Sequence, residues 1–81
     1  MTKEEISRAI KDAIMEVAPE IGEDEILPDA NIQRSLEIDS FDFLKVLTSL
    51  NEKLGVDVPE ADYGKVSTLS QMTDYFDGRM R

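Results

Sequence analysis

Apolar residues recur every three or four positions in three separate stretches of this chain, and this helical period constrains the fold more than any other feature. Thr2 and Glu5 have the spacing of a capping box, so the first helix is expected to begin there. Pro19 predicts its end, because the residue before a proline avoids the helical conformation. The apolar face of this helix comprises Ile6, Ala9, Ile10, Ala13, Ile14 and Val17.

The second stretch predicts a long helix that begins near Ser40. Either Asp39 or Ser40 can cap it, since both side chains accept hydrogen bonds from the free amides of a first turn. Gly55 suits the left-handed residue that ends many helices. The expected core face comprises Phe43, Leu44, Val46, Leu47, Leu50 and Leu54.

The third stretch predicts a last helix over residues 69–76. Thr68 and Gln71 form another capping box at its start. Gly78 is expected to end it, so that residues 78–81 form a frayed tail. The shared apolar face comprises Leu69, Met72 and Phe76.

The segment between the second and third helices is expected to be extended over residues 56–58, which are too few to form a strand without a partner. Pro59 is expected to open a short helical turn, because proline is tolerated at a first helical position. Gly64 is expected to end that turn.

Residues 19 to about 39 show no sustained period and predict a long loop, with a single helical turn near residues 30–34. Before Ile38 the loop holds six acidic residues against Arg34, a local charge of −5. It lacks the spacing of an EF-hand calcium loop, so a solvated acidic segment is favoured over a metal site. Apolar residues expected to pin it to the core are Ile21, Ile26, Leu27, Ile32 and Leu36.

These elements predict an all-α fold: a small bundle of three main helices plus one short helix, in a single domain over residues 1–81. The 18 acidic residues outnumber the 9 basic ones, which gives a net charge of −9. Nucleic acid and anionic membranes demand a basic surface and are therefore not expected as partners. Basic protein partners are favoured.

The composition also argues against catalysis. The chain contains no cysteine and no histidine, so it lacks a thiolate nucleophile, a disulfide and the usual general base. A non-catalytic protein follows. The N-terminal segment has no apolar region like that of a signal peptide, and no stretch is long enough to span a membrane. A cytoplasmic monomer is expected.

Ser40 stands out because it begins an amphipathic helix directly after a long irregular loop. The simple interpretation is an Asp-Ser capping pair. A cap, however, needs neither the long loop before it nor the aromatic Phe41 after it, which falls beside the core face. We expect Phe41 to be exposed and to take part in docking.

The whole chain resembles an acyl carrier protein. The triplet Asp39-Ser40-Phe41 is similar to the family's Asp-Ser-Leu or Asp-Ser-Met attachment motif. The helix that follows, the segment Gly-Val-Asp-Val-Pro at residues 55–59 and the segment Lys-Val-Ser-Thr-Leu at residues 65–69 add to the likeness. The order and spacing of these pieces fit the family over nearly all 81 residues.

The resemblance implies that a separate phosphopantetheinyl transferase moves 4′-phosphopantetheine from coenzyme A onto Ser40. Asp39 would help to organise the magnesium ion at the transferase interface. The thiol of the arm would then hold acyl groups as thioesters for partner enzymes with basic patches. Fatty-acid-like, polyketide, lipid and aminoacyl pathways all stay open.

The resemblance also implies a docking surface and an acyl pocket. The docking residues would be Glu37, Phe41, Asp42 and Lys45. The pocket residues would be Phe43, Leu47, Leu50, Val58, Tyr63, Val66 and Met72.

Two features depart from bacterial fatty-acid carriers: the second helix has mixed charge, and Phe43 and Tyr63 are bulky. The mixed charge indicates a different partner set. The bulk indicates either ordinary core filling or a small pocket for short, branched or aminoacyl cargo. The alternative function is a non-catalytic acidic helical adaptor in which Ser40 is only a cap.

Overall fold

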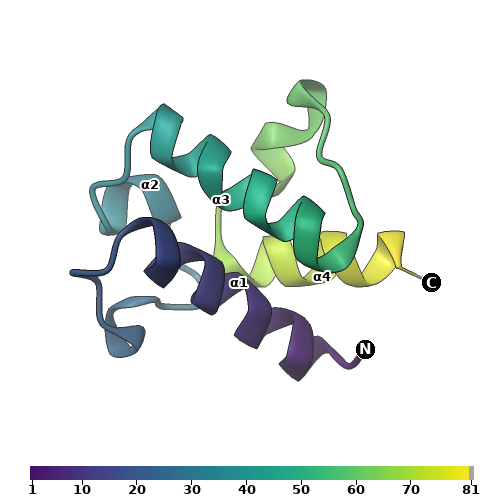
Figure 1. The fold of residues 1–81 in the computed structure, drawn as a ribbon, viewed down its shortest axis with the longest axis horizontal. Helices are drawn as coiled ribbons and strands as arrows, with labels where there is room; N and C mark the ends of the chain where they lie inside the picture. Colours follow the sequence, from purple (N-terminus) through teal and green to yellow (C-terminus); the bar gives the residue numbers. More distant parts are fainter. Residues whose placement is uncertain (81) are drawn as a thin grey trace.

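The computed structural model describes residues 1–80 and shows three long helices around one apolar core (Figure 1). The long helices are α1 (Lys3–Val17), α3 (Ser40–Leu54) and α4 (Leu69–Arg79), and α1 packs against both of the others. Three shorter elements are η1 (Glu23–Glu25), α2 (Ile32–Ser35) and η2 (Glu60–Lys65). Within the described range the only extended pairing is an isolated bridge between Asn31 and Thr68. The expected all-α bundle is confirmed.

The helix starts follow from local side-chain chemistry. Thr2 and Glu5 form the expected capping box at α1, and Thr68 and Gln71 form the second at α4. Each pair satisfies two backbone amides that the helix itself leaves free. Each long helix buries four residues on one face. Packing of that face against the other helices therefore stabilises a helix that the cap begins.

One predicted core residue of α3 is wrong. Leu44 is 41% exposed, whereas Phe43 is 5% exposed. The buried face is centred on Phe43, Val46, Leu47 and Leu50. Leu44 lies about 100° round the helix from Phe43, beyond the edge of that face. A spacing of three residues is therefore too permissive to decide which side of a wide apolar stripe faces inward.

Gly64 and Gly78 do not end their helices, contrary to the prediction from the sequence. The short helix η2 continues through Gly64 to Lys65, with Pro59 as its N-cap. Helix α4 continues through Gly78 to Arg79, and only Gly55 adopts a positive φ among the described glycines. A glycine ends a helix only where the chain must take that conformation. Gly78 and Arg79 therefore belong to α4 and not to a frayed tail, and Arg81 lies outside the described residues.

The long connection is anchored by isoleucines and by two backbone contacts. Ile21, Ile26 and Ile32 are buried as expected and Leu36 is partly buried, but Leu27 is 55% exposed. Ile26 is extended, and neighbouring residues in an extended chain point to opposite sides. The amide of Ile32 donates to the Ser67 carbonyl at 2.9 Å, and the amide of Ser70 donates to Pro28 at 3.0 Å. These bonds tie the loop to the start of α4.

Candidate functional site

The side chain of Asp39, not that of Ser40, caps α3. Asp39 Oδ1 accepts a hydrogen bond from the Asp42 amide at 2.8 Å, and Ser40 is the first residue inside the helix. Ser40 is exposed, and no hydrogen bond engages its hydroxyl within residues 1–80. The sequence left open which of the two residues caps α3. In the structure Asp39 is the cap, and the Ser40 hydroxyl is exposed and takes no part in capping.

The position of Ser40 suits a phosphate ester. The first amides of a helix have no partner inside the helix, and the Asp39 side chain occupies only the amide of Asp42. The amides of Ser40 and Phe41 and the positive end of the helix dipole favour a negative group at this end. The carboxylates of Asp39 and Asp42 oppose it by like charge. An exposed hydroxyl at a helix start thus fits a phosphopantetheine arm, with a small net electrostatic effect.

The chain approaches Ser40 through a strained turn. Glu37 has φ 54° and is the one described non-glycine residue with positive φ. The next residue, Ile38, is 5% exposed, and its amide donates to the Gln33 carbonyl at 3.0 Å. Ile38 thereby anchors the segment directly before Asp39 and Ser40. Sequence reasoning missed this anchor, although a single isoleucine between two acidic residues was the signal for it.

An exposed apolar pair lies on the outer face of α3. Phe41 is 76% exposed and Leu44 is 41% exposed; residues three apart on a helix are neighbours. Lys45 Nζ lies 3.7 Å from Asp42 Oδ1, and both side chains are well exposed. Next to them is a shallow hollow of about 340 Å³ lined by Glu16, Leu44, Lys45, Thr48, Ser49 and Glu52. Three of the four predicted docking residues thus gather on the first turns of α3, with Glu37 just before it.

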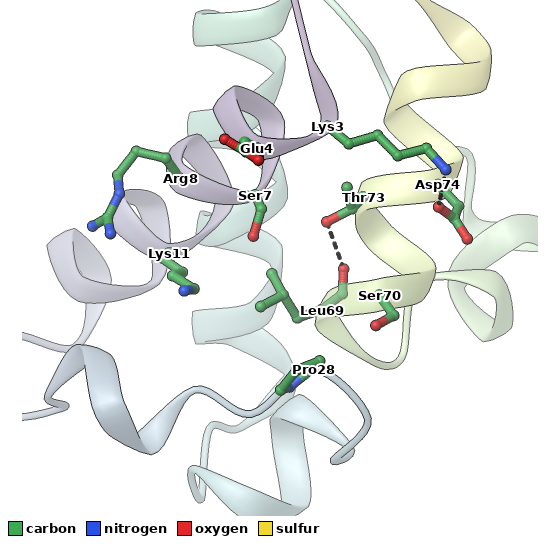
Figure 2. Close-up of a pocket in the computed structure, with 10 residues that line it drawn as sticks. All are labelled: Lys3, Glu4, Ser7, Arg8, Lys11, Pro28, Leu69, Ser70, Thr73 and Asp74. Carbon is green, nitrogen blue, oxygen red and sulfur yellow. Dashed lines mark hydrogen bonds and ion pairs between the residues drawn. The ribbon is translucent and has the colours of Figure 1, made fainter.

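The residues predicted to line an acyl pocket lie together in the core. Six of them are buried and Tyr63 is partly buried. They come from α3, from α4 and from the segment that contains η2. A larger hollow of about 540 Å³ lies elsewhere, between α1 and α4, with Pro28 and Leu69 at its edge (Figure 2). Neither hollow is lined by the predicted pocket residues, which belong to the buried core cluster or pack against it.

Two further findings concern metals and membranes. Within the described residues no group of three or more acidic side chains is arranged to hold a metal ion. No helix in residues 1–80 is both long and apolar enough to cross a membrane.

The chain is similar to known proteins over most of its length. The family described as "Phosphopantetheine attachment site" matches residues 8–76. An acyl carrier protein of Lactobacillus johnsonii is 36% identical over 75 residues, covering 93% of this chain and 92% of the relative. One of Rubrobacter xylanophilus is 31% identical over 77 residues, covering 93% and 91%. One of Thermosynechococcus vestitus is 25% identical over 80 residues, covering 99% and 98%.

A small acidic helical bundle with an exposed serine at a helix start is typical of proteins that carry a prosthetic arm. The chain belongs to the acyl carrier protein family, the group of proteins with a phosphopantetheine attachment site. Its cofactor is therefore 4′-phosphopantetheine, held covalently, and its role is that of a carrier rather than a catalyst. Membership of this family implies interaction with acyl-processing enzymes.

Proposed function

We propose that Ser40 is the attachment site and that the arm carries acyl intermediates as thioesters. The observation that carries this proposal is the free, exposed hydroxyl of Ser40 at the first position of α3, with Asp39 as the cap. In the transfer, Ser40 Oγ bonds to the phosphorus next to the pantetheine of coenzyme A. The pyrophosphate bond breaks, the adenosine bisphosphate leaves, and the serine proton is released.

Asp39 has a second part in this proposal. One carboxylate oxygen accepts the Asp42 amide, and the other stays available as a ligand. Magnesium prefers carboxylate oxygens and retains several waters, so a transferase complex can use one such ligand. Asp39 would therefore hold both the helix start and the metal ion that accompanies coenzyme A.

The partner surface would be the first turns of α3. Phe41 offers an exposed apolar contact, and Glu37, Asp42 and Lys45 would add charges of both signs. Acidic contacts with basic patches mainly set the encounter rate and the choice of partner. The exposed Lys45 beside Asp42 gives α3 a mixed charge. This mixed charge favours a partner set distinct from that of strongly acidic carriers. We further propose that the protein acts in fatty-acid-like or specialised biosynthesis. It would do so in the cytoplasm, as a monomer.

The cargo proposed is short, branched or aminoacyl. Phe43 is 5% exposed in the core, and Tyr63 of η2 is partly buried against that core. Because protein interiors are closely packed, a long chain needs these side chains to move apart.

The test is incubation with coenzyme A, magnesium and a promiscuous phosphopantetheinyl transferase, followed by intact mass measurement. We expect a gain of one phosphopantetheine in the parent protein and in Ser35→Ala, an exposed serine nearby, and none in Ser40→Ala. Ser40→Ala should change the free energy of unfolding by less than about 0.5 kcal/mol, whereas Asp39→Ala should cost about 1 kcal/mol as a lost cap. No gain in the folded parent protein would instead favour the acidic adaptor.

A further inference from the structure

The short helix η2 is held to the bundle by few buried contacts of its own. None of its own residues is fully buried, although Tyr63 is partly buried against the core. It is a 3₁₀ helix, whose hydrogen-bond geometry is weaker than that of an α-helix. Its backbone bonds are local, from Asp62 to Pro59 and from Val66 to Tyr63. In Figure 1 it lies as a separate green segment between the end of α3 and the start of α4.

The side chain of Asp62 supplies the polar attachment that η2 otherwise lacks. Its Oδ2 accepts from the Tyr75 hydroxyl at 2.7 Å and from the Arg79 guanidinium at 3.0 Å. Its Oδ1 lies 3.4 Å from Lys65 Nζ. The Asp62 side chain is only 14% exposed, so these charge-assisted bonds are stronger than those of surface pairs.

The two donors on α4 are themselves held in place. The Arg79 guanidinium carbon lies 4.7 Å from the centre of the Tyr75 ring, within the range of a cation–π contact. The Tyr75 ring also meets Phe76 edge-on, with centroids 5.9 Å apart. The Tyr75 hydroxyl, more than any other group, lowers the pKa of Asp62.

We propose that Asp62 is a positioning residue that limits cargo length by holding η2 closed against α4. This inference rests on the carrier function proposed above. The core below η2 is packed: Val58 and Val66, at its two ends, are buried, as is Met72 of α4. A longer acyl chain needs room there, and η2 contributes no fully buried residue that would have to be displaced. The free energy needed to break the Asp62 contacts therefore adds to the cost of admitting each longer chain.

The first test measures the attachment itself, in the unmodified protein. Asp62→Ala removes the acceptor, and Glu60→Ala is the matched control, because Glu60 is an exposed acid of the same helix with no side-chain partner within residues 1–80. We expect amide hydrogen exchange in residues 60–66 to rise about tenfold in Asp62→Ala, as loss of a hydrogen bond to a charged group gives, and to stay unchanged in Glu60→Ala. Tyr75→Phe, which keeps the ring, should give a smaller rise. An equal rise in the buried amides of α1 would overturn the proposal, because Asp62 would then serve only global stability.

The second test measures cargo length. A promiscuous transferase loads acyl groups from acetyl to palmitoyl from their coenzyme A esters, and hydroxylamine cleavage reports how well each thioester is sheltered. We expect Asp62→Ala to protect octanoyl and longer thioesters several-fold better than the parent protein and Glu60→Ala do, with no difference for acetyl. Identical profiles, despite faster exchange in η2, would refute the link to cargo. Absence of any loading at Ser40 would instead refute the carrier function, while the exchange experiment would still judge the attachment of η2.

Discussion

At the residue scale, the segment just before Ser40 contains the one non-glycine residue with positive φ among residues 1–80. Glu37 adopts a left-handed conformation that costs a residue with a side chain about 1–2 kcal/mol. It persists because Ile38, one residue on, is buried and hydrogen-bonded. Such strain is often found at functional sites, where surrounding contacts over-determine the backbone. The position of Ser40 is therefore maintained by buried contacts on its loop side and by the Asp39 cap on its helix side.

The positive φ of Glu37 predicts that glycine is more stabilising than alanine at this position, the reverse of their order inside a helix. Both Glu37→Ala and Glu37→Gly remove the charge, but only glycine adopts positive φ without penalty. We expect the glycine variant to be more stable than the alanine variant by about 1 kcal/mol in urea unfolding. At Glu52, an exposed position within α3, the same pair should show alanine ahead by about 0.5–1 kcal/mol. Alanine ahead at both positions would show that Glu37 is not strained.

At the element scale, the helix starts were predictable and the helix ends were less so. Thr2, Thr68 and Asp39 cap their helices through contacts with residues only three positions away, and such contacts can be read from the sequence. The ends depend on what the following segment must reach. Gly55 turns the chain after α3 with φ 71°, whereas Gly78 stays inside α4 because α4 continues to pack and Arg79 is held by Asp62.

These two glycines predict substitutions of opposite sign. Neither has an atom that a new methyl group would meet within 4 Å, so space plays no part in the comparison. Gly55→Ala should lower the free energy of unfolding by about 1 kcal/mol, because φ is positive there. Gly78→Ala should raise it by about 0.5–1 kcal/mol, because alanine favours a helix. Thermal or urea unfolding of both variants checks this, and changes of the same sign would contradict it.

At the scale of the whole molecule, stability depends on a few specific carboxylates as well as on the net charge. Hydrogen bonds from the Thr2 backbone and hydroxyl lower the pKa of Glu5. Lys53 lowers the pKa of Glu16, and Arg8 lowers that of Glu23. The Tyr75 hydroxyl lowers the pKa of Asp62. In each case the unfolded chain binds the proton more readily than the native protein does.

Acid should therefore destabilise the protein in a defined range. The stability that these four carboxylates contribute is fully present above their ordinary pKa values, near pH 4, and is lost as the pH falls through the lowered values. Urea unfolding between about pH 7 and pH 3, in high salt to screen the general repulsion of the −9 charge, measures it. We expect the urea concentration at the unfolding midpoint to decrease as the pH drops below about 4. In Glu16→Gln this midpoint should decrease less steeply with pH. A midpoint that does not change with pH in the parent protein would contradict the prediction.

The sequence by itself determined the all-α class, the three helix starts and the place of Ser40, because those depend on period and on contacts between near neighbours. It also indicated that Phe41 would be exposed, and this is confirmed. Only the tertiary structure decided that Leu44 and Leu27 face solvent, that Ile38 is an anchor, and that Asp62 attaches η2 to α4. These depend on which face of each element the other helices cover. A pair 13 residues apart, such as Asp62 and Tyr75, leaves no local pattern in the chain.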